Sequence, residues 1–335
     1  MQWYVILSIA LAAVIIFAVV FTLVPALIID RAVFGVRQDK NPQYKYFTAE
    51  DFNLATETVP VYYGGTILSA ALYTVKPVEE CGKVIIFQHG FGAGSSSYMT
   101  EIAHFAQQGN AVLAADAYGC NNSAGKSIKG FYAGAEAVIA AYIAVRSDER
   151  LKDKPVILVG HSWGAYSVLA ACGVLRPDGV VAMSAFDSPS QCVCDTLKSM
   201  GGTVKSYAPL VKGWLYVINL FRFGAKGNTK AAAALKKSDV KALLIHGAKD
   251  GAVPVNHSPA KIAEGENITA IIYEDKRHNP YNTSAAEDMF SHLADGGKLE
   301  TEQEAARFYA EFDWAAATEE DGAVMEEIDR FIANA

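Results

Sequence analysis

Four short apolar runs place the strongest constraint on how this chain can fold. They cover residues 84–87, 111–115, 156–159 and 180–183, and each is too uniformly apolar to keep one face in water. Such runs are typical of strands that are buried on both faces of a parallel sheet. Helix-like stretches separate them at 98–108, 131–145 and 165–175, and two further strands are expected at 242–245 and 268–273. The alternation predicts an α/β fold with a mostly parallel, doubly wound sheet.

Three other segments frame this sheet. Alternating runs at 59–63 and 67–73, separated by Gly64 and Gly65, predict an antiparallel hairpin. An insert over about 187–238 interrupts the alternation of strands and helices, and it exceeds the length of an ordinary connection. Its aromatic residues stand on helix-compatible sequence, so we expect a helical cap over a pocket, with simple packing of the insert on the sheet as the alternative. After Asn279 the chain is long enough for two or three helices, including 302–312 and 324–332.

The N-terminal segment has no charged residue from Trp3 to Ile29, and about 20 apolar residues are enough to cross a bilayer as a helix. A cleaved secretory signal would need a basic start, a shorter apolar stretch and a small-residue cleavage site, and the sequence has none of these. We therefore predict a transmembrane anchor over 1–30, a linker over 31–50 and one large domain over 51–335. Just after the span stand the basic residues Arg31, Arg37, Lys40 and Lys45. They favour a cytoplasmic domain, although the orientation of a single anchor can follow other signals.

The composition excludes two classes of function. The formal net charge is -7 and no Lys/Arg cluster stands out, which argues against nucleic acid as a partner. The five cysteines are an odd number and are scattered, so free thiols are expected. Cys192 and Cys194 are a close pair, but without further ligands at suitable spacing they do not predict a zinc site.

Residues Gly160, His161, Ser162, Trp163 and Gly164 form a GxSxG pentapeptide. An apolar strand leads directly into it and an alanine-rich helix leads out, which is the context of a nucleophile elbow. A sharp turn of this kind leaves no room for flanking side chains, hence glycine on both sides. We therefore expect Ser162 to be a nucleophile at the carboxyl edge of the sheet.

A serine nucleophile needs a base and an acid that orients the base. Among seven histidines, His278 is favoured because it follows the last predicted strand, with His257 as the alternative. For the acid we expect Asp250, which lies just beyond the preceding strand, and its rival is Asp187. Both acids satisfy the chain order Ser, Asp, His.

The glycine-rich stretch 89–94 follows the first buried strand and can present backbone amides to an oxyanion. The amide of Phe91, together with that of Trp163 after the nucleophile, is the expected pair of donors. His89, Trp214 and Phe221 are expected to line the substrate pocket.

Taken together, these motifs resemble the α/β-hydrolase family, and within it the branch of monoacylglycerol lipases and serine aminopeptidase-like hydrolases. The resemblance rests on the HGFG turn, the GHSWG elbow, the GAKDGAVP loop and the late histidine. It implies an α/β-hydrolase fold and hydrolysis of an ester, amide or related acyl bond through an acyl-enzyme, without metal or organic cofactor. The long segment after the histidine and the N-terminal anchor depart from the family pattern.

These observations predict a membrane-tethered serine hydrolase that cleaves an ester with an apolar acyl part, so its partners are a small-molecule or lipid-like substrate and the membrane. Two alternatives remain. One is an amino-terminal peptidase or amidase on the same fold, although Asp195 is the one acid between Ser188 and Ala234 that could hold a free amine. The other is a non-catalytic, membrane-tethered binding protein, whose mark would be loss of a triad member.

Overall fold

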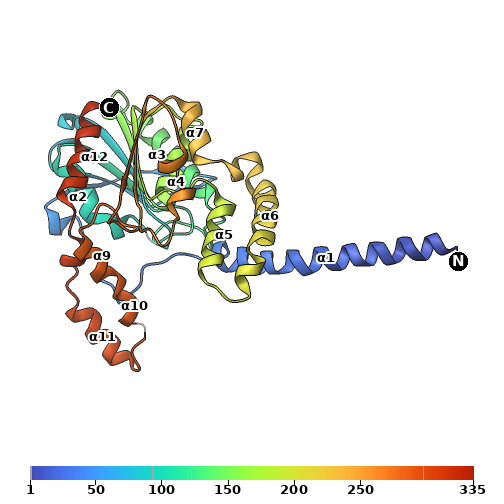
Figure 1. Ribbon diagram of the computed structural model, residues 1–335. Coiled ribbons are helices and arrows are strands. Elements are labelled where there is room, and N and C mark those ends of the chain that lie inside the picture. The colour runs from blue at the N-terminus through green and yellow to red at the C-terminus, as the bar shows by residue number, and fades with distance from the viewer. Residues whose placement is uncertain (1, 93, 297) are drawn as a thin grey trace.

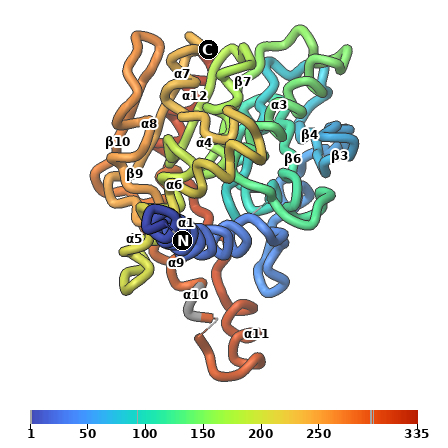
Figure 2. The backbone as a smooth tube through the Cα atoms, turned by 90° about the vertical axis from the view of Figure 1, so that its right-hand side faces the viewer, coloured from blue at the N-terminus to red at the C-terminus, as the bar shows by residue number. Residues whose placement is uncertain are grey.

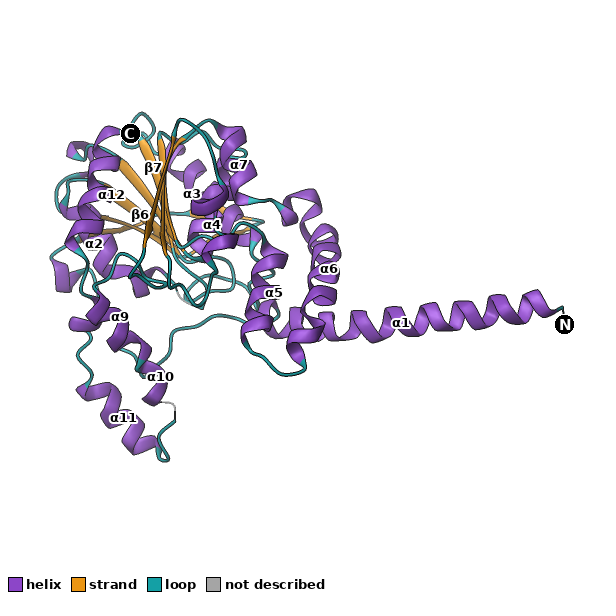
Figure 3. Cartoon of the chain, in the orientation of Figure 1, coloured by secondary structure: helices purple, strands orange, loops and turns teal. Residues whose placement is uncertain are grey.

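The computed structural model describes residues 2–92, 94–296 and 298–335. Its centre is an eight-stranded sheet in the order β1-β4-β6-β5-β7-β8-β9-β10, in which β1 and β4 pair antiparallel and the strands from β6 onward run parallel (Figures 1 and 3). The strands are β1 (Ala55–Thr58), β4 (Ala70–Thr74), β5 (Val84–Gln88), β6 (Ala111–Ala115), β7 (Val156–His161), β8 (Gly179–Met183), β9 (Lys241–Gly247) and β10 (Ile268–Tyr273). The predicted parallel α/β sheet is therefore confirmed.

Helices cover both faces of the sheet, as its two-sided burial requires. One face packs against α3 (Tyr132–Ser147), α4 (Trp163–Cys172) and α7 (Ala231–Ser238). The opposite face packs against α2 (Met99–Gln107) and α12 (Gly322–Asn334). The strands between these layers are almost completely buried, so their backbone positions are fixed from both sides.

Two segments differ in detail from the prediction. The run 67–73 divides at Ser69: β2 (Val61–Tyr63) and β3 (Thr66–Leu68) form a separate hairpin, whereas β4 joins the large sheet. After β10 the described residues form the α-helices α9 (Ser284–Ser291), α10 (Leu293–Gly296), α11 (Glu302–Glu311) and α12, with the short η6 (Ala316–Thr318) before α12. Of these, α12 closes the sheet, while α10 and α11 form a small cluster of their own with Tyr44 and Trp314.

The insert is helical, with α5 (Pro189–Ser199), α6 (Val204–Phe223), α7 and the short η4 (Gly224–Asn228). Helix α7 packs against α4 and so belongs to the layer on the sheet. The other two helices pack against each other beside that layer (Figure 1).

Helix α1 (Trp3–Phe34) projects from the body of the molecule (Figures 1 and 2). Among the described residues it is the helix that is long and apolar enough to cross a membrane, with mean hydropathy 3.0 over an 18-residue window that is 0% buried. Its C-terminal part meets the domain, from Phe21 and Thr22 onward, and Ala26, Asp30 and Phe34 are buried there. It continues four residues past the predicted anchor of 1–30.

Candidate active site

Ser162 stands between β7 and α4 in a backbone conformation that non-glycine residues rarely adopt, with φ 55° and ψ -116°. The glycines on either side are required by close approach of other backbone segments. A Cβ on Gly164 would lie 1.9 Å from the carbonyl oxygen of Gln88, and one on Gly160 would lie 2.4 Å from that of Gly164. The turn therefore has the strained geometry of a nucleophile elbow.

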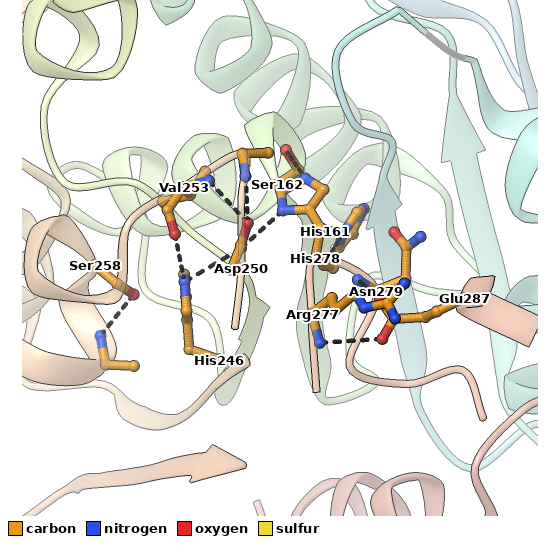
Figure 4. Close-up of polar contacts among 12 residues, drawn as sticks. His161, Ser162, His246, Asp250, Val253, Ser258, Arg277, His278, Asn279 and Glu287 are labelled. Carbon is orange, nitrogen blue, oxygen red and sulfur yellow. Dashed lines mark hydrogen bonds and ion pairs between the residues drawn. The ribbon is translucent and has the colours of Figure 1, made fainter. Parts of the chain in front are cut away.

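Ser162, His278 and Asp250 come together at the carboxyl edge of the sheet (Figure 4). The Ser162 Oγ lies 3.0 Å from His278 Nε2, and His278 Nδ1 lies 2.8 Å from Asp250 Oδ2. A neutral His278 that donates from Nδ1 to the carboxylate can accept the serine proton at Nε2. This arrangement suits general-base activation of a serine hydroxyl.

The carboxylate of Asp250 is held from several directions. Its Oδ1 accepts hydrogen bonds from the amides of Ala252 and Val253, each at 2.8 Å. Its Oδ2 also lies 3.2 Å from Nε2 of the buried His246. Burial alone would raise the pKa of Asp250, but the hydrogen bonds from His246, His278 and Val253 hold the pKa well below its usual value. The acid is therefore ionised and fixed in orientation.

The two alternative residues have other partners. The Oδ1 of Asp187 accepts a hydrogen bond from the amide of Ala232 at 2.9 Å, at the start of α7. His257 Nδ1 lies 2.6 Å from Asp195 Oδ2. The structure thus brings Asp250 and His278 to Ser162, and it uses Asp187 to cap a helix.

A buried carboxylate that the sequence did not reveal fixes the loop of His278. Glu287, on α9, accepts hydrogen bonds from the amides of Arg277 at 3.0 Å and Asn279 at 2.8 Å (Figure 4). These two amides flank His278 directly. Since Glu287 lies in a helix-like stretch with other charged residues, no sequence signal distinguishes it from a surface residue.

A second network joins the base to the glycine-rich turn. The Gly90 amide donates to the Tyr98 hydroxyl at 3.1 Å, and that hydroxyl lies 2.9 Å from His161 Nδ1. His161 Nε2 in turn lies 2.9 Å from the carbonyl oxygen of His278. Complete burial, with His278 nearby, lowers the pKa of His161 to about 3, so the ring stays neutral and donates from Nε2. The network is positional, and it could not be predicted because Tyr98 is distant in sequence.

The expected oxyanion donors are free in the structure. Within residues 2–92, 94–296 and 298–335, no protein group accepts a hydrogen bond from the amide of Phe91 or Trp163. Asp116 ties down the end of the turn, because its Oδ1 accepts from the Ser95 amide at 2.8 Å. Ala93, within the same turn, lies outside the described residues.

The residues expected in the pocket are placed differently. His89 is fully buried, and its Nε2 accepts the amide of Ala117 at 2.9 Å. Trp214 donates from Nε1 to Thr22 of α1 at 3.1 Å, and Phe221 is 87% exposed. We therefore assign none of the three to the pocket: one supports the turn, one holds α1 and one faces solvent.

Other aromatic rings surround the oxyanion turn. Phe131 packs against Phe91, Trp163 and Phe186, with ring centroids 4.8 to 6.3 Å apart. On its other side Phe131 meets Phe34, the last residue of α1, at 4.9 Å. These contacts form an aromatic wall beside Ser162.

Comparisons with known proteins agree with this architecture. The search of the curated proteins found no match. The esterase Pf2001 of Pyrococcus furiosus superposes with a TM-score of 0.55 at 14% identity, over 78% of this chain and 96% of that one. Est1E of Butyrivibrio proteoclasticus with bound ferulic acid superposes with a TM-score of 0.50 at 18% identity, over 65% of this chain and 90% of that one. At such identities the likeness shows the fold alone.

The sequence itself also carries the family's pattern. The family model described as the alpha/beta hydrolase family matches residues 84–311, which is more than half of the 335 residues. The match runs from β5 through the elbow, the acid loop and the histidine loop to α11. The chain therefore belongs to the α/β-hydrolase family.

Proposed function

We propose that this protein is a serine hydrolase that cleaves an ester through an acyl-enzyme, with Ser162 as nucleophile, His278 as base and Asp250 as the orienting acid. The observation that carries the proposal is the continuous contact from Ser162 Oγ to His278 at 3.0 Å and from His278 to Asp250 at 2.8 Å. The strained backbone of Ser162 adds support, because such strain concentrates at functional residues.

The chemistry follows from these positions. His278 Nε2 removes the proton as Ser162 Oγ attacks the carbonyl carbon, and the amides of Phe91 and Trp163 hold the developing oxyanion. His278 then gives the proton to the departing alcohol, which leaves the acyl-enzyme. Water attacks that ester with His278 again as base, and the acid is released.

An apolar acyl group suits the site better than a charged one. Beside Ser162, Phe91 presents an apolar ring that is 39% exposed, and the buried rings of Phe131 and Phe186 pack behind it. For an amino-terminal peptidase, the carboxylate of Asp195 would have to bind a free amine, but it already contacts His257 at 2.6 Å and Gln191 at 2.7 Å. We therefore place the ester ahead of the peptide.

We also propose that α1 remains in the mature protein and spans a bilayer. Its exposed apolar part begins at Trp3, and contacts with the domain start at Phe21 and Thr22, about 20 residues later, which at about 1.5 Å per residue matches a hydrocarbon core of about 30 Å. The buried contacts at its end would be lost on cleavage. Basic residues after the span favour a cytoplasmic domain.

The direct test uses a fluorophosphonate probe on the full-length protein in membranes. The wild-type chain should be labelled, and Ser162→Ala should lose labelling and lower ester turnover by several orders of magnitude, since no other group can replace the nucleophile. A series of esters of increasing acyl length would then define the substrate. Labelling that survives in Ser162→Ala would refute the assignment of the nucleophile.

A further inference from the structure

Helix α6 has three sides with different surroundings. Its inner side is buried against the domain through Ala208, Val211 and Leu215. A second side faces α1, where Trp214 meets Thr22 and Arg222 forms a two-point ion pair with Asp30 at 2.6 and 3.1 Å. The remaining side is open to solvent.

This open side is apolar. Leu210 is 47% exposed, Tyr216 53%, Leu220 45% and Phe221 87%. Leu210 and Phe221 are about three helical turns apart and so lie on the same side, and Tyr216 and Leu220 are one turn apart beside them. We call these four residues the interfacial face. A cluster of large apolar side chains in water needs a partner.

The charge of the insert identifies the kind of partner. From Thr196 to Ser238 the chain has no Asp or Glu, although its overall net charge is -7. The same segment has eight basic residues: Lys198, Lys205, Lys212, Arg222, Lys226, Lys230, Lys236 and Lys237. An amphipathic helix with large apolar residues on one side and lysines around it is typical of binding to an anionic lipid surface.

The position of α6 fits the same partner. It crosses the base of α1 and is the outermost element on the side from which α1 projects (Figures 1 and 2). Its contacts with α1 begin at Phe21, which packs against Tyr207 with ring centroids 6.2 Å apart. This level is where a bilayer spanned by the preceding part of α1 would end, so the interfacial face would meet the lipid head groups.

We propose that the interfacial face of α6, with the lysines of the insert, rests on the surface of the bilayer that α1 spans and favours anionic head groups. This inference rests on the proposed membrane anchor. Two attachments, one through α1 and one through α6, fix the orientation of the domain on the membrane. The aromatic wall beside Ser162 is connected to α1 through the contact of Phe131 with Phe34.

The test places a fluorescent label on the open side of α6 in the full-length protein. Phe221→Cys carries an environment-sensitive nitrobenzoxadiazole label, and the matched control is Glu326→Cys on α12, at the opposite face of the sheet. The wild-type chain, whose cysteines are buried or half-buried, gives the background. Each protein is inserted into phosphatidylcholine vesicles with or without phosphatidylserine and with spin-labelled lipids.

We expect spin-labelled lipid to quench the label at position 221 several-fold more than the label at 326, and phosphatidylserine to increase this quenching. Lys205→Gln, Lys226→Gln and Lys230→Gln together should remove the increase while hydrolysis of a water-soluble ester stays unchanged. Equal, weak quenching at both positions would overturn the proposal. If the label at position 221 were instead protected from the quencher to a degree that rises with the number of protein molecules per vesicle, a second copy of the chain would cover the interfacial face. That result would also overturn the proposal.

Two controls separate this inference from the proposed function. Fluorophosphonate labelling in the same vesicles reports on Ser162, and resistance to extraction with alkaline carbonate reports on α1. If both hold and the label at 221 is not quenched, the contact of α6 with lipid is wrong while the hydrolase and its anchor stand.

Discussion

At the scale of single residues, the two acids that the sequence left open make different contacts. Asp250 faces His278 at 2.8 Å, whereas Asp187 caps α7. Asp250→Asn should therefore lower kcat by about 10⁴ on the precedent of a Ser-His-Asp triad, because the imidazole would adopt the wrong tautomer. Asp187→Asn should change kcat little, since the Asn side-chain oxygen can still accept the Ala232 amide and the residue does not contact His278. Steady-state ester hydrolysis measures both, and the reverse ranking would transfer the acid to the loop after β8.

Glu287 permits a second comparison between neighbouring residues. Its buried carboxylate holds the amides on both sides of His278, while the adjacent Asp288 lies on the surface and pairs with Arg277. Glu287→Ala should lower kcat by about 10 to 100-fold with little change in KM, because a displaced imidazole reduces transition-state stabilisation. Asp288→Ala is the control and should remain within about twofold. Folding of both variants is checked by circular dichroism, and a normal kcat in a folded Glu287→Ala would exclude the positioning role.

At the scale of elements, the sequence predicted the strands and turns that are defined by a run of neighbouring residues. Strands β6 and β10 begin and end where the apolar runs at 111–115 and 268–273 do. For β6 the reason is burial on both faces, which requires continuous apolar sequence, whereas β10 is a half-buried edge strand whose apolar run is still bounded by polar residues. The GxSxG turn was predictable because the pentapeptide, the strand before it and the helix after it are contiguous in the sequence. The bend at Ser69 was missed, since alternating residues on both sides of it satisfy one continuous strand equally well.

Contacts between distant elements were not predictable. Trp214 and Phe221 were expected in the pocket because large aromatic residues in an insert suit a cap. Their positions depend on α1, almost 200 residues earlier in the chain: Trp214 donates a hydrogen bond to Thr22 of α1, and Phe221 is exposed to solvent. The contact of Tyr98 with His161, 63 residues later at the end of β7, is of the same kind. Glu287 contacts a loop only eight to ten residues before it, but the sequence pattern does not show that its carboxylate turns inward.

The packing of α1 on α6 can be tested through its ion pair. The Asp30 side chain is only 10% exposed and pairs with Arg222, whereas the pair of Arg277 and Asp288 is 48% and 58% exposed. Arg222→Gln leaves a nearly buried carboxylate without its cation, so it should destabilise the fold by roughly 1 to 3 kcal/mol. Arg277→Gln should cost less than about 0.5 kcal/mol. Thermal unfolding of the full-length variants in detergent measures both, and equal losses would mean that α1 is held by its apolar contacts alone.

At the scale of the whole molecule, the proposed anchor is part of the domain. Phe34 at the end of α1 packs against Phe131, and Phe131 packs against Phe91, whose amide is a proposed oxyanion donor. Two aromatic contacts therefore link the end of α1 to the ring of Phe91 in the proposed oxyanion turn.

A charged cluster joins the C-terminal helix α12 to α2, on the face of the sheet that both helices cover. His104 on α2 lies 2.9 Å from Asp329 of α12 and 3.0 Å from Glu320, and all three side chains are half-buried. Burial alone would lower the pKa of His104, but hydrogen bonds to the two carboxylates raise it to about 10. Nearby, burial raises the pKa of Glu101 to about 8. Protonated forms of both groups are therefore favoured by folding.

The sign of the pH dependence follows from these two shifts. The stabilising contribution of His104 is complete below its unfolded pKa of about 6.5 and is lost as the pH rises to about 10. Glu101 acts in the same direction between about 4.5 and 8, because the unfolded chain loses its proton first. We therefore expect the melting temperature of the full-length protein in detergent to fall between pH 7 and 10.

His104→Gln should destabilise the protein by roughly 1 to 3 kcal/mol at pH 6 and by progressively less above pH 8, whereas Glu101→Gln should gain stability relative to wild type as the pH approaches 8. A His104→Gln difference that stays constant from pH 6 to 10 would mean that the histidine holds α12 as a neutral hydrogen-bond partner and that its charge adds nothing to the junction.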